Sequence, residues 1–426
     1  MVTKVLPPPF PPAEYERRMT EWFSIVRFRE SGVVMFPVRM DRARRITQFL
    51  RDQNLQKKII PDIKKVKFLP ISADFISTID SPIELFSLFE ENKDFSVTDL
   101  DKLLLQKYKD KLFVILITDA ENLYIQNKSR TLSVLNDFAY KYRNNVTIIQ
   151  FSELNILHPE YFYFIQKYSA IFNNIVYAPL YEKKEIFHFM DYLVSYFEME
   201  NNQLTEKLKE EIYENCGGHP WLVKEAIRYL RNTNSDGIAS SVQERTRNDI
   251  NENNDLIFHH EEMEMEIRVI WNGMMEAERE LLKKITLGNL SFTSDEKASL
   301  AYLIKMKILN KAPKGFVFTQ KLLEEFVEKE ISINIITLGT RDQVMINGVD
   351  VSGVFSKNEN KVLSLMIGKS GNIVSREELG GVLWRDGEYS DWALDRLISR
   401  VRKKLSKVGC GPKVLKTILG KGYLIN

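Results

Sequence analysis

Trp392, Arg396, Arg400, Lys403 and Lys407 follow one another at intervals of three or four residues near the C-terminus. At about 100° per residue, this spacing places them on one face of a helix. An arginine can donate two parallel N–H bonds to O6 and N7 of guanine, and a lysine acts as a point charge for phosphate. The pattern therefore suits a helix that enters the major groove of double-stranded DNA. The alternative is a cationic face that meets only solvent.

The opposite face of the same helix is apolar and would pack it on its domain, through Leu394, Ile398, Val401, Leu405 and Val408. Charge is distributed unevenly along the chain. The chain has 60 Lys and Arg against 58 Asp and Glu, but residues 332–426 alone carry 15 basic and 9 acidic residues. A basic segment behind an acidic body indicates a polyanionic partner, although many solvated surfaces are as basic.

A second charged set lies in FPVRMDRARRITQF (residues 36–49), after an apolar stretch that predicts a strand. A phosphate site at such a turn uses glycine N–H groups, a lysine and a hydroxyl that holds magnesium. No glycine occurs between Gly32 and Gly217, and Asp41 would oppose an anion. We therefore expect at most a weak ATPase, no metal and no cofactor, with ATP or ADP as the only candidates. The residues at this turn that are left as candidates to contact a phosphate are Arg39, Arg42, Arg44 and Arg45.

The composition indicates which class of protein carries these two groups of charged residues. A chain of 426 residues with 44% hydrophobic and 28% charged residues is typical of a globular protein of several domains. No apolar run reaches the roughly 20 residues that span a bilayer, and the proline-rich start lacks a signal sequence, so we predict a cytoplasmic protein without a membrane partner. Cys216 and Cys410 are expected to be reduced thiols.

The elements around the cationic helix predict a winged helix. Residues 331–353 alternate and contain a turn at Asn347 and Gly348, which indicates a strand hairpin. Ser356 with Glu359, and Ser375 with Glu378, have the spacing of capping boxes that start two helices. After the cationic helix, GPKVLKTILGKGYLIN predicts two further strands.

This order resembles the OmpR/PhoB-type winged-helix DNA-binding domain of bacterial transcription regulators, over about the last 95 residues. The resemblance implies that Trp392, Ala393, Arg396, Leu397 and Arg400 face bases. It implies that Arg402, Lys403 and Lys404 contact phosphates or flank the groove, and that Thr417 and Lys421 lie on the wing. Lys407 belongs to the cationic face. The chain departs from the family at Leu419, where an arginine is common, so minor-groove insertion would fall to Lys421.

The first half of the chain alternates apolar strands with helical patterns, which predicts an α/β domain with a parallel sheet. The expected strands are SGVVMFPV, KVKFLPIS, KLFVILITD, NVTIIQF and NNIVYAPL. Asp119 ends the third strand where a Walker B aspartate would lie, but Ala120 separates it from Glu121. We favour a strand-end cap as its role.

Residues 13–235 resemble STAND and related AAA+ ATPases, most clearly in IVYAPLYEKKEIFHFMDYL and in Gly217, Gly218, His219 and Pro220. In that family the latter segment comes near the nucleotide. The predicted fold class is thus a P-loop NTPase-like α/β (AAA+/STAND) domain with a parallel sheet, followed by two winged-helix (α+β) domains. The resemblance, without the phosphate-binding glycines, implies an ATPase fold that has lost catalysis.

We predict five segments. They are a proline-rich start (1–12), the ATPase-like domain with its helical lid (13–235), a linker (236–261), a first winged helix (262–331) and the OmpR/PhoB-type domain (332–426). The adjacent His259 and His260 are interpreted as linker residues rather than metal ligands.

The predicted function is DNA-binding transcriptional regulation, in which the body senses a signal or oligomerises and controls the last domain. The alternatives are an ATP-driven STAND-type switch with a rebuilt phosphate site and an initiator resembling origin-recognition proteins. Partners beyond double-stranded DNA are a second copy of the chain and an unknown ligand or protein. The operator, the sign of regulation and the signal stay open.

Overall fold

The computed structural model describes residues 9–89, 96–200, 204–235, 256–332, 336–340, 343–346, 348–384, 390–408, 410, 414–418 and 420–425. It forms two compact units. The first comprises Met1–Arg279 with Phe292–Leu322, and the second comprises Glu280–Ser291 with Leu323–Asn426. The boundaries of the five predicted segments stay predictions, and the Pro-rich residues 1–8 and most of the linker, 236–255, lie outside the described residues.

The first unit is built on a five-stranded parallel sheet in the order β2-β3-β4-β1-β5. All five predicted strands are present. The central strands β3 and β4 are mostly apolar and nearly fully buried, as expected where helices cover both faces. The bounds are β1 Gly32–Met35, β2 Val66–Ser72, β3 Leu112–Thr118, β4 Val146–Ser152 and β5 Asn174–Tyr177.

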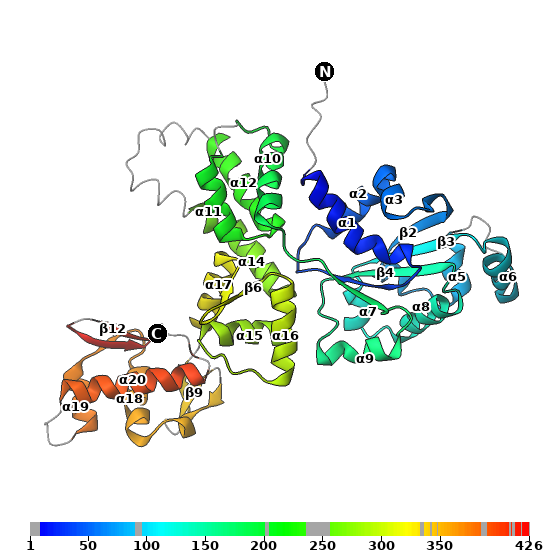
Figure 1. Ribbon diagram of the computed structural model, residues 1–426. Coiled ribbons are helices and arrows are strands. Elements are labelled where there is room, and N and C mark those ends of the chain that lie inside the picture. Colours follow the sequence, from blue (N-terminus) through cyan, green and yellow to red (C-terminus); the bar gives the residue numbers. More distant parts are fainter. Residues whose placement is uncertain are drawn as a thin grey trace. The chain divides into compact units, whose positions relative to one another are not determined.

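Helices lie on both sides of this sheet. Figure 1 shows α1 to α3 on one side and α7 to α9 on the other. Phe23 of α1 stacks on Phe49 of α2 at 3.8 Å between ring centres, which joins two helices of one layer. The helices of this region are α1 Pro12–Arg27, α2 Arg42–Arg51, α3 Gln53–Ile59, α4 Ala73–Ile76, α5 Pro82–Ser87, α6 Val97–Lys102, α7 Glu121–Ile125, α8 Ser129–Lys141 and α9 Pro159–Lys167.

Three helices follow the sheet in the range where the lid was predicted, α10 Lys183–Tyr196, α11 Glu206–Cys216 and α12 Pro220–Ser235, and α14 Glu261–Gly273 packs against α12 after the predicted linker. Pro220 opens α12, as predicted. A Cβ on Gly218 would meet the backbone oxygen of Tyr181 at 1.9 Å, so only glycine fits there. His260 accepts a hydrogen bond from the Met263 N–H at 3.3 Å and thereby caps α14.

The first winged-helix region follows in chain order as α15 Glu276–Thr286, α16 Ser294–Lys305, β6 Leu309–Ala312, β7 Gly315–Phe318 and α17 Lys321–Ser332. Thr293 and Glu296 form a capping box that starts α16. The strands β6 and β7 pair antiparallel as a hairpin, which is the expected wing.

In its described residues, the last domain has two small antiparallel sheets around three helices. The strands β8 Ile336–Leu338, β9 Val344–Ile346 and β10 Val349–Asp350 form the first sheet, and Asn347 of the predicted turn lies outside the described residues. Helices α18 Lys357–Gly368, α19 Arg376–Leu383 and α20 Asp391–Lys407 follow, with β11 Ile373–Val374, β12 Leu415–Ile418 and β13 Gly422–Ile425 in the second sheet.

The predicted helix starts are largely confirmed. Ser356 and Glu359 form a full capping box, whereas Ser375 accepts from the Glu378 N–H and Glu378 instead pairs with Lys369. Gly420 and Gly422 have φ of +68° and +142°, as the hairpin requires. The parallel sheet and the winged-helix elements confirm the predicted fold class.

Candidate nucleic-acid interface and predicted phosphate position

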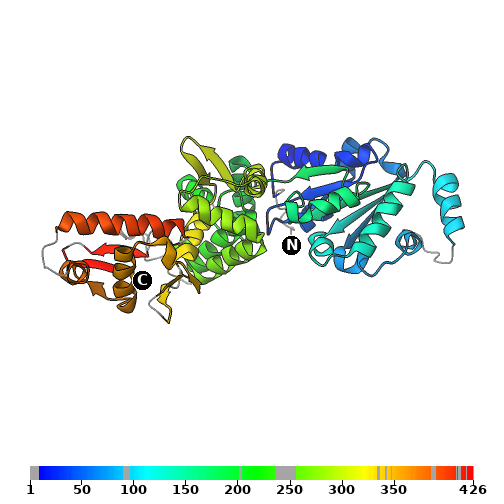
Figure 2. The same cartoon turned by 90° about the horizontal axis from the view of Figure 1, so that it is seen from below.

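Helix α20 has a buried seam and a charged outer face. Figure 2 shows it, in orange-red, along one side of the last domain. Its buried residues belong to the core of that domain and are Leu394, Leu397, Ile398, Val401 and Leu405. The exposed residues on the other face include all four cations of the predicted DNA-binding face, Arg396, Arg400, Lys403 and Lys407. These four cations therefore share one accessible surface.

One assigned residue lies elsewhere. Leu397 is 4% exposed and packs in the core, so its side chain is turned away from the face that carries Arg396 and Arg400. The apolar seam is one residue wider than the predicted one, because positions i, i+3 and i+4 all reach the core. The expectation that Leu397 faces a base does not fit this conformation.

The first turn of α20 presents an aromatic ring beside a cation. Trp392 is 68% exposed, and the guanidinium carbon of Arg396 lies 5.2 Å from its ring centre. This separation is within the range of a cation–π contact. Ala393 is half-buried next to them, and its N–H donates to the Ser390 hydroxyl at 3.2 Å, which caps the helix.

Two further cations of α20 share a buried carboxylate. The Glu359 side chain is 3% exposed and accepts from Lys404 at 2.6 Å, while Arg400 Nε lies 3.8 Å away. Burial alone would raise the pKa of Glu359, but hydrogen bonds from Lys404 and Ser356 lower it below its ordinary value. Lys404 is thus a structural cation, and Arg400, whose side chain is 59% exposed, keeps most of its surface available.

Arg402 connects α20 to the wing. Its Nε donates to the backbone oxygen of Leu415 at 2.9 Å, and Nη2 donates to the Thr417 hydroxyl at 2.6 Å. These bonds orient β12 against the helix. Lys421 is exposed in the turn that follows Gly420. Of the expected phosphate contacts, Lys403 lies open on the helix, whereas Arg402 and Lys404 already hold partners within the domain.

A network that the sequence did not reveal fixes α20 on its other neighbours. Arg376 pairs with Asp391 at 3.0 Å and with Asp395 at 2.7 Å, and Asp395 also accepts from the Tyr423 hydroxyl. These hydrogen bonds lower the pKa of Asp395, and burial together with Asp395 raises the pKa of Tyr423 to about 12. The i, i+4 spacing of the two aspartates was the available sequence signal.

In the first unit, the predicted phosphate position is filled by charges of the chain itself. Arg42 opens α2, and its side chain is 9% exposed. Its Nη2 donates to Glu121 Oε1 at 2.8 Å and to Asp119, and Nη1 lies 3.2 Å from Glu153 Oε1. Asp119 and Glu153 directly follow the adjacent strands β3 and β4, so the three carboxylates meet at one sheet edge.

This cluster has more carboxylates than cations. Burial raises the pKa of Glu153 to about 7, against the attraction of Arg42, and the nearby Glu121 adds to the rise. Asp119 has a φ of +55° and serves as an acceptor for Arg42 rather than as the strand-end cap that we favoured. Sequence reasoning missed Glu121 and Glu153 as partners, although both lie near the ends of predicted strands.

The other three arginines of the turn also have partners. The Arg39 backbone N–H donates to Glu153 at 3.1 Å, and its side chain reaches Glu266 of α14 at 3.2 Å. Arg44 donates to the Tyr192 hydroxyl at 2.7 Å and lines, with Asp41 and Pro220, a cavity of about 70 Å³. Arg45 is 2% exposed and lies 3.9 Å from the ring centre of Phe10. The turn therefore brings its arginines to separate partners rather than to one shared anion position.

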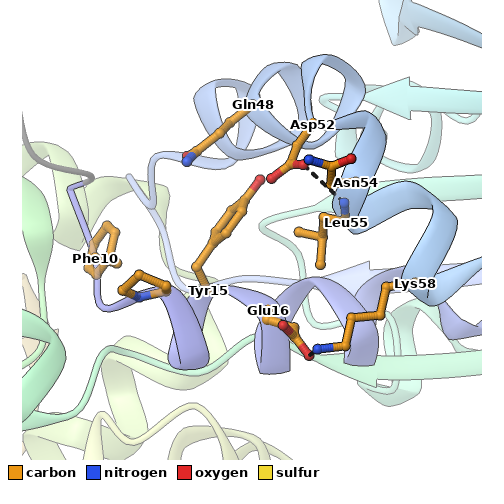
Figure 3. A pocket seen from close by; sticks show the side chains of 9 residues that line it. Phe10, Tyr15, Glu16, Gln48, Asp52, Asn54, Leu55 and Lys58 are labelled. Atoms are coloured by element: carbon orange, nitrogen blue, oxygen red, sulfur yellow. Dashed lines mark hydrogen bonds and ion pairs between the residues drawn. The ribbon is translucent and has the colours of Figure 1, made fainter. Parts of the chain in front are cut away.

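A cavity of about 400 Å³ lies between α1 and the pair α2 and α3. Figure 3 shows the Tyr15 ring rising from α1 toward Asp52, with Phe10 on one side. The Tyr15 hydroxyl is buried and has no hydrogen-bond partner among the described residues, and Lys58 pairs with Glu16 nearby. None of the four arginines lines this cavity, so it is distinct from the predicted phosphate position.

The comparisons with known proteins bear first on the last domain. Residues 352–425 match the family described as "Transcriptional regulatory protein, C terminal". Residues 352–425 are an OmpR/PhoB-type DNA-binding domain. This confirms the resemblance for that part of the chain, and the match does not extend to earlier residues. Within the described residues, no helix is long and apolar enough to cross a membrane.

Two curated relatives match a stretch of about 70 residues of this chain. The chain is 40% identical over 70 residues to the response regulator protein GraR of Staphylococcus aureus strain MRSA252, which is 16% of this chain and 31% of that protein. It is 43% identical over 68 residues to a transcriptional regulatory protein CpxR homolog of Haemophilus influenzae, covering 16% of this chain and 30% of the relative. The chain thus spans about a third of the length of these curated relatives.

Solved structures with a similar outline have low sequence identity. A Walker-type ATPase of Pyrococcus abyssi is 15% identical, with a TM-score of 0.42 over 75% of this chain and 95% of the other. The Aeropyrum pernix ORC1 protein in complex with DNA is 11% identical, with a TM-score of 0.35 over 100% and 91% of the two chains. Values this low carry no conclusion about activity or partners.

Proposed function

We propose that this chain is a transcriptional regulator that binds double-stranded DNA through the outer face of α20, while its ATPase-like body regulates that domain without hydrolysing nucleotide. The observation that carries the proposal is the exposed row of Arg396, Arg400, Lys403 and Lys407 opposite a fully buried seam, within an OmpR/PhoB-type domain. A cationic face held by a packed seam keeps its geometry when it meets the groove.

The contacts divide by chemistry. Arg396 and Arg400 have the planar donors that suit guanine, so we assign them to bases. Lys403, Lys407 and Lys421 are exposed and suit phosphates. Arg402 acts through β12 by holding Thr417, and Lys404 acts through Glu359. The two internally paired cations are therefore positioning residues rather than phosphate contacts.

The body supports a role without catalysis. Arg42 places a guanidinium among Asp119, Glu121 and Glu153, where one fixed positive charge balances carboxylates that could otherwise attract a cation. A magnesium nucleotide would need that cluster to open. We infer that the body signals through a ligand, a protein partner or a second copy of the chain, with the segment boundaries predicted from the sequence.

The experiment is calorimetric titration of the full chain with magnesium ATP, together with an assay for phosphate release. We expect no turnover and no tight binding. Tight binding that disappears when Arg42, Arg44 and Arg45 are changed to alanine would contradict the proposal and would favour the ATP-driven switch with a rebuilt phosphate site. Retained folding of that variant is checked by circular dichroism.

A further inference from the structure

The first turn of α20 carries two groups that together could read DNA bases. Trp392 is 68% exposed, although its side chain offers a large apolar ring, and Arg396 lies one turn further along the same face. The guanidinium carbon is 5.2 Å from the indole centre. Trp392 is the only residue with which Arg396 makes a polar or ring contact within the described residues. The pair is therefore a preformed unit on an open surface.

The helix backbone beneath this pair is held in place from its other side. Arg376 of α19 binds Asp391 and Asp395, the residues just before Trp392 and Arg396. Asp395 is also joined to Tyr423 of β13. The Ser390 cap fixes the start of the helix. The orientation of Trp392 and Arg396 thus follows from contacts that the pair itself does not make.

The chemistry of the pair selects particular base edges. A guanidinium that stacks on a ring keeps its N–H edge free, and this edge matches O6 and N7 of guanine. The indole offers an apolar surface next to that guanine contact. The apolar group in the major groove is the 5-methyl of thymine, and covering both surfaces removes them from water.

We propose that Trp392 and Arg396 act as one specificity-determining pair that selects a guanine with a thymine on the neighbouring base pair. This inference rests on the proposed function, because it needs α20 in the major groove. It goes further by naming the base step and by assigning Trp392 to the thymine methyl group. Arg400, one turn further on, reads a separate position.

The test starts from duplexes that the full chain enriches from a random library. In an enriched duplex, each thymine is replaced by deoxyuridine, which lacks only the 5-methyl group, and each guanine by 7-deazaguanine, which lacks N7. Fluorescence anisotropy gives the affinity. For the wild type, we expect one thymine beside a guanine at which deoxyuridine weakens binding about three- to fivefold, and 7-deazaguanine at its neighbour to weaken it about tenfold.

The variant Trp392→Ala should bind the thymine duplex as weakly as the wild type binds the deoxyuridine duplex, and should no longer distinguish the two. Trp392→Phe should recover part of the discrimination, and Lys403→Ala should keep it while weakening binding to every duplex. If deoxyuridine has no effect at any thymine, or if Trp392→Ala keeps the full discrimination, the pair assignment is wrong although DNA binding stands. If no duplex is enriched at all, the proposed function itself fails.

Discussion

At the scale of single residues, neighbouring lysines of α20 have different tasks. Lys403 is exposed, whereas Lys404 donates to the buried carboxylate of Glu359 at 2.6 Å. A sequence wheel cannot separate them reliably, because the partner of Lys404 lies 45 positions away on α18. Substitution by alanine is therefore expected to have different effects at the two positions.

Changing Lys403 to alanine should weaken binding to all duplexes alike and reduce the slope of log affinity against log salt concentration by about 1, with unchanged stability. Changing Lys404 to alanine should instead lower the stability of the last domain by about 1–3 kcal/mol, because Glu359 is left buried without its cation. Salt titrations by anisotropy and urea unfolding of both variants measure the two effects. Equal losses of stability would show that Lys404 has no structural role.

The carboxylates around Arg42 predict a dependence of stability on pH. Burial raises the folded-state pKa of Glu153 from 4.5 to about 7. A carboxyl with a raised pKa contributes stability that is full below pH 4.5 and is lost as the pH rises through 7. Between pH 5 and pH 8, this contribution falls by about 2–3 kcal/mol.

Urea unfolding of the full chain should therefore show a weaker body at pH 8 than at pH 5. The variant Glu153→Gln should show a smaller difference, and Glu160→Gln, whose side chain is 62% exposed, should behave as the wild type. Glu278, with a pKa that burial raises to about 7, leaves a residual slope in the same direction. A Glu153→Gln variant with the full wild-type pH dependence would refute the assignment.

At the scale of secondary-structure elements, the sequence predicted what local patterns encode. Apolar runs identified all five strands of the parallel sheet, and the spacing of Ser356 and Glu359 identified the start of α18. The prediction that Leu397 faces a base was wrong, because it followed the corresponding position in the OmpR/PhoB-type family and not the width of the apolar seam of the helix. The Arg42 cluster could not be predicted, because it depends on strand order, which brings the ends of β3 and β4 together.

The wing offers a matched pair of glycines. A Cβ on Gly422 would meet the backbone oxygen of Val374 at 2.1 Å, whereas a Cβ on Gly420 meets nothing within 4 Å. Both residues have positive φ, so alanine is strained at either, but only Gly422 also joins β13 to β11 at close range. The contact at Gly422 is with backbone, which cannot move aside as a side chain would.

Gly422→Ala should therefore raise hydrogen exchange across β11 to β13 and weaken DNA binding at least tenfold. Gly420→Ala should cost about 1 kcal/mol and leave exchange in β11 unchanged. Hydrogen exchange with mass spectrometry on the full chain resolves these strands. Similar exchange in both variants would show that the close approach does not hold the wing.

At the scale of the whole molecule, the chain joins an α/β unit with a five-stranded parallel sheet to a DNA-binding domain of a kind found in response regulators. Arg42 pairs with carboxylates of the chain itself at the predicted phosphate position, whereas the cationic face of the last domain is exposed. The charge is divided in the same way between the two parts of the chain, since the net positive charge is confined to residues 332–426. On the proposed function, DNA binding depends on one helix, α20.

The most direct test compares the full chain with two triple variants on an enriched duplex and on its scrambled counterpart, by fluorescence anisotropy at physiological salt. The first variant changes Arg396, Arg400 and Lys403 to alanine, and the second removes equal charge from the exposed Lys57, Lys64 and Lys109 of the body. We predict that the wild type and the second variant prefer the enriched duplex at least about a hundredfold, and that the first variant loses this preference. Wild-type binding by the first variant, or an equal loss in the second, would contradict the central claim.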